Sequence, residues 1–80
     1  MFALFTRSRR DTVQPGGEFE PRRIGMVRTT ARVLNVVDDL HGIPHVTFEL
    51  TVAPPSGPKV TSGTRTLSLE RFTDLYPVAL

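Results

Sequence analysis

Apolar and polar residues alternate most regularly over residues 45–52. The apolar positions are Val46, Phe48, Leu50 and Val52, and the polar positions are His45, Thr47, Glu49 and Thr51. Side chains of a β-strand point alternately to opposite faces, so a period of two is typical of a half-buried strand. The pattern predicts a strand whose even-numbered residues face a core.

A second strand is predicted over residues 26–37, which are rich in valine and threonine and lack proline and internal glycine. Its odd positions are Val27, Thr29, Ala31 and Val33, and its even positions are Arg28, Thr30 and Arg32. The apolar phase then changes, because Leu34 and Val36 are even and Asn35 is odd. A β-bulge near Asn35 would absorb this change, and burial of this end on both faces is the alternative.

The two strands are expected to form an antiparallel hairpin, because the segment 38–44 between them contains Asp, Gly and Pro. A register in which paired residue numbers sum to 81 sets Arg32 opposite Glu49 and Thr30 opposite Thr51. Such facing pairs are favourable by a few tenths of a kcal/mol. A sum of 83 would instead set Val33 against Leu50. We favour the first register.

The C-terminal third predicts a strand followed by a short helix. Prolines 54, 55 and 58 end the second strand of the hairpin, and residues 60–69 form the next strand, with Gly63 as a bulge or bend. Leu69, Phe72 and Leu75 then recur at helical spacing. Ser68 can cap this helix and Pro77 can stop it, which leaves residues 77–80 for a short closing strand.

The N-terminal part gives a weaker pattern. Residues 1–6 begin with an apolar run, Met-Phe-Ala-Leu-Phe, and form either the first strand or a docking peptide. We favour the strand, because a chain of 80 residues needs the apolar area for its core. Residues 7–23 are polar and contain Pro-Gly-Gly, so we expect a long polar loop, in part disordered.

These elements predict one mainly β domain over residues 1–80: a small antiparallel sheet or SH3-like barrel with one short C-terminal helical turn. The element order resembles that of SH3-like small barrels, in which a helical turn precedes the last strand. The acidic-aromatic peptide-binding pattern of SH3 domains is absent, as is tryptophan. An OB-like barrel and an open sheet packed by one helix are the alternatives.

Composition narrows the class of protein. The absence of cysteine excludes disulfides and thiolate chemistry and fits a reducing, cytoplasmic location. The apolar start is too short, and the arginines follow rather than precede it, so we expect neither a signal peptide nor a transmembrane segment. The net charge is +2, but the first 32 residues carry seven arginines against three acids.

Those arginines are the candidate site for nucleic acid or another anion: Arg7, Arg9, Arg10, Arg22, Arg23, Arg28 and Arg32. A guanidinium offers charge and a planar donor fork that suits phosphate. Single-strand binding also needs exposed aromatic platforms. Of the six aromatic residues, the core requires Phe48 and Phe72, and Phe19 is flanked by acids. We therefore favour solvated arginines over a nucleic-acid site.

A candidate metal cluster consists of Asp38, Asp39, His41 and His45. Gly42 and Pro44 prevent the helical geometry that would bring both imidazoles to one ion, so we expect an aspartate to bond the turn backbone instead. The sequence indicates no catalytic residue and no cofactor: no nucleophile lies in an elbow motif, and Gly16-Gly17 does not join a strand to a helix. It predicts a small non-catalytic binding or interaction module whose partner is another protein, with weak nucleic-acid binding as the alternative.

Overall fold

Over the residues that the structure describes, the sheet strands are followed by a short helix and a last short strand. In a computed structural model, which describes residues 12–22 and 25–80, they are β1 (Glu18–Glu20), β2 (Arg28–Asp38), β3 (Pro44–Ala53), β4 (Val60–Ser68), α2 (Leu69–Leu75) and β5 (Val78–Ala79). The mainly β class and the short C-terminal helix are therefore confirmed.

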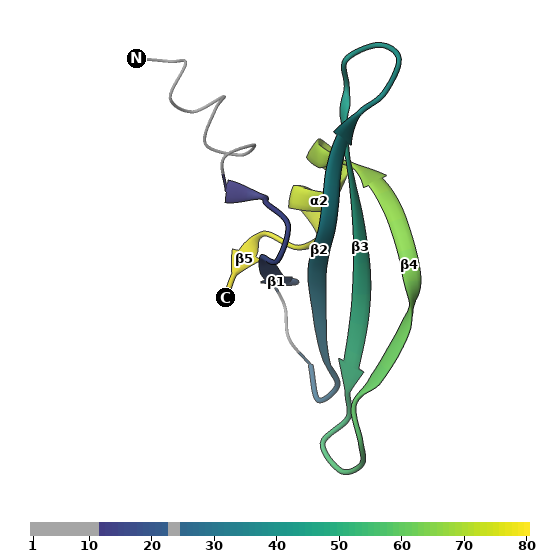
Figure 1. Cartoon of the computed structure of the whole chain (residues 1–80). Helices are drawn as coiled ribbons and strands as arrows, with labels where there is room; N and C mark the ends of the chain where they lie inside the picture. Colours follow the sequence, from purple (N-terminus) through teal and green to yellow (C-terminus); the bar gives the residue numbers. More distant parts are fainter. Residues whose placement is uncertain (1–11, 23–24) are drawn as a thin grey trace.

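The strands form one antiparallel sheet in the order β4-β3-β2-β1-β5 (Figure 1). Within the described residues the sheet is open: β4 and β5 are its two edges, and three strands separate them. Of the two predicted forms, the molecule thus has the small antiparallel sheet and not the SH3-like barrel. The two-residue β5 pairs with β1, at the edge opposite β4, and so does not close a ring.

The β2–β3 hairpin has the predicted register. Arg32 faces Glu49 and Thr30 faces Thr51, and the pairing then shifts between Val33 and Asn35. This shift is the predicted bulge. It keeps both Val33 and Val36 in contact with the core although their residue numbers differ in parity.

Strand β4 contains a second irregularity. Its pairing with β3 shifts between Glu49 and Thr51, which corresponds on β4 to the step from Thr64 to Thr61. Gly63 lies in this step, as expected for a bulge or bend. Threonine hydroxyls bridge the two strands on either side of it, Thr47 to Thr66 at 3.1 Å and Thr51 to Thr61 at 3.4 Å.

Helix α2 begins and ends as predicted. The Ser68 hydroxyl accepts a hydrogen bond from the Arg71 N–H at 3.2 Å, and the Tyr76 N–H donates to the Phe72 carbonyl at 2.9 Å before Pro77. Leu69 and Phe72 are the buried residues of the helix. They point to the sheet, so α2 covers part of one face.

The predicted loop over residues 7–23 contains a strand. Gly16 and Gly17 turn the chain against β2, where the Gly16 N–H donates to the Val33 carbonyl at 2.8 Å and the Val33 N–H donates to the Gly17 carbonyl at 2.9 Å. Gly16 has a φ of 92°, which favours glycine. Strand β1 follows, so the prediction of a loop is wrong over Glu18–Glu20. The prediction for residues 1–6 lies outside the described part of the chain.

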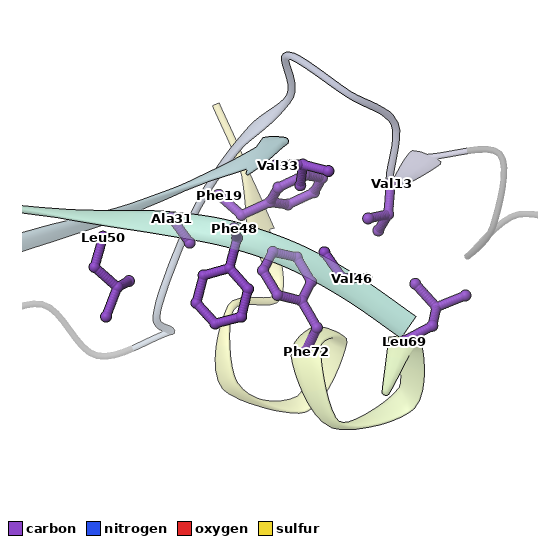
Figure 2. Packing of buried hydrophobic residues seen from close by; sticks show 9 residues of the cluster. All are labelled: Val13, Phe19, Ala31, Val33, Val46, Phe48, Leu50, Leu69 and Phe72. Carbon is purple, nitrogen blue, oxygen red and sulfur yellow. The ribbon is translucent and has the colours of Figure 1, made fainter. Parts of the chain in front are cut away.

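One aromatic cluster forms the centre of the core (Figure 2). The Phe72 ring from α2 lies 5.0 Å from the Phe48 ring and 5.6 Å from the Phe19 ring, both in edge-to-face geometry. Tyr76 packs at the side of this cluster. The buried apolar residues are Val13, Phe19, Ala31, Val33, Val46, Phe48, Leu50, Leu69 and Phe72. All four aromatic residues of the described chain thus belong to the core side of the sheet.

Candidate binding surfaces

Three of the seven candidate arginines lie in the described residues. Arg22 is exposed beyond β1, and Arg28 and Arg32 lie on the sheet face opposite α2. The remaining four, Arg7, Arg9, Arg10 and Arg23, lie outside the described part of the chain. Of these three candidate arginines, the structure therefore brings only Arg28 and Arg32 together.

Arg28 binds a buried carboxylate. Its Nε lies 2.6 Å from Glu20 Oε2 and its Nη2 lies 3.2 Å from Glu20 Oε1. The Glu20 side chain is only 3% exposed, whereas that of Arg28 is 59% exposed. The hydrogen bond from Arg28 to Glu20, and next the attraction between their charges, raise the pKa of Arg28 above its ordinary value. Arg28 thus neutralises a carboxylate that would otherwise be buried without a counter-charge.

Arg32 lies between two further carboxylates. It faces Glu18 on β1 and Glu49 on β3 across the sheet, and its Nε is 3.8 Å from Glu49 Oε1. Both partners of the Arg32–Glu49 pair are partly exposed, so the attraction is screened by solvent. Its positive charge is nevertheless offset locally.

The face that carries these arginines is hollowed into a groove of about 550 Å³. Its charged lining consists of three acids and three bases: Glu18, Glu20, Glu49, Arg28, Arg32 and Lys59. Thr30, Thr51 and Thr61 cross the groove floor on three neighbouring strands. A groove with balanced charge and no aromatic lining exerts little net attraction on a polyanion.

The candidate metal cluster is a hydrogen-bonded turn. Asp39 Oδ1 accepts the N–H groups of His41 at 2.7 Å and of Ile43 at 3.0 Å. These bonds, the one from Ile43 foremost, and the attraction of His45 lower the pKa of Asp39. His45 Nδ1 lies 3.0 Å from the Ile43 carbonyl and 3.8 Å from Asp39 Oδ2.

This arrangement matches the expected role of an aspartate in the turn backbone. In the part of the chain that the structure describes, no three carboxylate or imidazole groups gather as a metal would require, and Asp38 and His41 make no such set with their neighbours.

The outer edge of β4 is the longest strand edge without a neighbouring strand in the described chain. Strand β4 has nine residues and pairs on one side with β3. Its bulge at Gly63 and the exposed Arg65 are features that limit unselective edge pairing. Between residues 50 and 69 the charged residues are Lys59 and Arg65, with no acid. The edge is thus extended, accessible and weakly basic.

Exposed apolar side chains gather at the two ends of the hairpin. Met26, Val27 and Val60 are 84%, 49% and 58% exposed at the end where β3 turns into β4. Val37, Leu40 and Ile43 are 54%, 101% and 49% exposed at the turn between β2 and β3. The sequence pattern placed Val27 on the apolar side of its strand and did not predict that these six residues are exposed, because their exposure depends on how far α2 and the sheet extend.

No described helix is both long and apolar enough to cross a lipid bilayer. Comparisons of the chain with protein-family models, with curated proteins and with solved structures found no match. The surfaces described above are therefore the basis on which function is proposed.

Proposed function

We propose that this domain is a small, non-catalytic binding module that accepts an extended segment of a partner protein along the edge of β4. The observation that carries the proposal is the nine-residue edge itself, paired with β3 on one side and open on the other within the described chain. An extended peptide can add a strand at such an edge, with main-chain hydrogen bonds supplying the affinity.

The charge along β4 indicates what kind of segment fits. Arg65 is exposed on the strand and Lys59 precedes it, and no acid occurs between residues 50 and 69. A second β4 strand would bring like charges together, whereas a partner strand with acidic side chains would be attracted. We therefore propose an acidic, extended partner segment.

Weak nucleic-acid binding is the competing function, and it remains a prediction. The ion pairs of Arg28 and Arg32 count against it, since two of the three candidate arginines in the described residues already face carboxylates. The described aromatic rings lie in the core cluster and offer no platform for bases. A cytoplasmic location, suggested by the absence of cysteine, likewise remains a prediction.

The test places the photo-crosslinking residue p-benzoylphenylalanine at Thr64 on β4, with a matched placement at Arg71 on the exposed side of α2. We expect one discrete protein adduct from position 64 and none from position 71. The adduct partner is then purified, and its affinity is measured for the wild type, for Arg65→Glu and for the control Arg71→Glu.

If the partner segment is acidic, Arg65→Glu weakens binding at least tenfold, which corresponds to about 1.4 kcal/mol, and Arg71→Glu leaves it unchanged. Equal affinities for all three proteins would contradict the proposal. A parallel titration with single- and double-stranded oligonucleotides at two salt concentrations tests the alternative. Salt-sensitive shifts of the amides between Arg22 and Arg32 would favour nucleic acid instead.

A further inference from the structure

The groove on the sheet face opposite α2 has an acidic end. Glu18, Arg32 and Glu49 face one another there across β1, β2 and β3, and all three line the groove. One guanidinium stands against two carboxylates, so Arg32 neutralises one of them and a single negative charge is left. The charges of the groove are therefore balanced in total but not at this end.

The other end of the groove is basic. Arg28 lies on the same face of β2 as Arg32, and Lys59 directly precedes Val60, where β4 begins. The charge of Arg28 is neutralised by the buried Glu20 carboxylate. Lys59 makes no ion pair with any residue that the structure describes. This end therefore keeps one positive charge, on Lys59.

The Arg28–Glu20 pair also presents donors to the groove. Glu20 accepts hydrogen bonds from Nε and Nη2 of Arg28, so the N–H groups of Nη1 are not used by this pair. The Glu20 side chain is 3% exposed, which holds the guanidinium in a fixed orientation. An oriented guanidinium edge suits a carboxylate. Arg28 thus adds directed hydrogen bonds at the end where Lys59 supplies the charge.

Threonine side chains lie between the two ends. Thr30 is midway between Arg28 and Arg32 on β2, and it pairs with Thr51 on β3, which pairs with Thr61 on β4. A hydroxyl both donates and accepts hydrogen bonds, so this row suits the amide groups of a peptide backbone. The groove thus offers an acidic end, a row of hydroxyls and a basic end.

The dimensions of the groove fit a short peptide. The step from Arg28 to Arg32 spans about 13 Å along β2, and an extended peptide spans about 3.3–3.6 Å per residue. Its volume of about 550 Å³ lies within the usual range of small-ligand sites, about 300–1,000 Å³. Among the described lining residues only Ala53 and Leu80 are apolar and none is aromatic, so bases and acyl chains find little surface.

We propose that this groove binds a zwitterionic peptide of about three or four residues. Its ammonium group lies at the end formed by Glu18 and Glu49, and its carboxylate lies at the end formed by Lys59 and Arg28. A polyanion or a polycation is attracted at one end and repelled at the other, whereas a zwitterion is attracted at both. The inference does not rest on strand addition at β4, because the peptide uses no main-chain group of the outer β4 edge. Either can fail without the other.

The test titrates trialanine into the full chain at low salt, where exposed charges are least screened, and follows the backbone amide shifts. We expect saturable shifts at Thr30, Thr51 and Thr61, with a dissociation constant on the order of 1–10 mM. Dialanine is too short to reach both ends. Acetyl-trialanine lacks the ammonium group and trialanine amide lacks the carboxylate. Each of the three should bind weaker than trialanine by about threefold or more.

Two variants test the orientation of the peptide. Lys59→Gln should weaken the binding of trialanine by about threefold, and it should not change the binding of trialanine amide, which has no carboxylate to lose. Glu18→Gln should weaken the binding of trialanine similarly and should not change that of acetyl-trialanine. Arg71→Gln, on the exposed side of α2, is the control and should bind trialanine like the wild type. All three positions are exposed, so the variants should keep the fold.

Four results would overturn the proposal. They are the absence of saturable shifts up to about 50 mM trialanine, shifts centred outside the groove, equal affinities for trialanine and its blocked forms, and affinities that Lys59→Gln and Glu18→Gln leave unchanged. None of these results bears on the β4 edge, which is tested separately by crosslinking.

Discussion

Replacing Phe72 by alanine tests whether α2 is packed on the sheet as described. Phe72 is 0% exposed. The centroid of its ring lies 5.0 Å from that of Phe48, 5.4 Å from that of Tyr76 and 5.6 Å from that of Phe19. Truncation of a fully buried phenylalanine costs about 3–5 kcal/mol, through lost burial and the cavity left behind.

That loss is large for a chain of 80 residues, whose total free energy of unfolding is expected to be about 4–12 kcal/mol. Urea denaturation followed by circular dichroism measures it. With a slope of about 1–2 kcal/mol per molar urea, the midpoint falls by about 1.5–5 M. Arg71→Ala, on the exposed side of the same helix, should change stability by no more than about 0.5 kcal/mol. A cost below about 1 kcal/mol for Phe72→Ala would refute the packing of α2 against β3.

Three further predictions follow from single features of the structure. The pKa of Asp39 in the folded protein is lower than its ordinary value of 3.8. The ionised carboxylate therefore stabilises the fold when the pH is above 3.8, and this contribution is lost as the pH falls through the lower folded-state pKa. Asp39→Asn should therefore lose less stability than the wild type between about pH 5 and pH 2 in urea titrations; equal losses would contradict this. Arg28→Gln removes the counter-charge of the buried Glu20 carboxylate, so it should destabilise the protein more than Arg28→Gln combined with Glu20→Gln, and the reverse order in thermal melts would exclude the pair as described. Gly42→Ala places a side chain on a residue with a φ of 76° and should lower the free energy of unfolding by about 1–2 kcal/mol. Gly25 has open space around it and no positive φ, so Gly25→Ala should lower it little. Similar losses in urea denaturation of both variants would show that the turn is not as described.

The β2–β3 hairpin could be predicted from sequence because its determinants are local. Two long alternating segments fix which residues face the core, and parity then restricts the register to a few choices. The facing pair of Arg32 and Glu49 favoured the correct register among these choices, and the change of apolar phase at Asn35 located the bulge. The same register indicated that Arg32 lies opposite an acid, so part of the arginine site could be assessed before the structure.

Strand β1 and the buried ion pair could not be predicted in this way. Three residues, Glu18–Glu20, are too few to show a period, and the strand exists through pairing with Ala31 and Ala79, which are distant in sequence. Without that strand, nothing placed Glu20 beside Arg28. The local pattern also could not predict whether the sheet closes into a barrel or stays open, because this depends on which edge of the sheet β5 joins. The exposed patches at the hairpin ends depend in turn on how much of the sheet α2 covers.

The most direct measurement of the proposed function is hydrogen–deuterium exchange of the β4 amides, in the free chain and in the complex with the partner identified by crosslinking. In the free chain, we predict that amides of β4 that point away from β3 exchange fast and that those bonded to β3 exchange slowly. In the complex, the fast amides between Val60 and Ser68 become protected, because the added strand accepts their hydrogen bonds. Unchanged β4 amides, with protection confined to the groove on the opposite face from α2, would contradict strand addition and place the partner elsewhere.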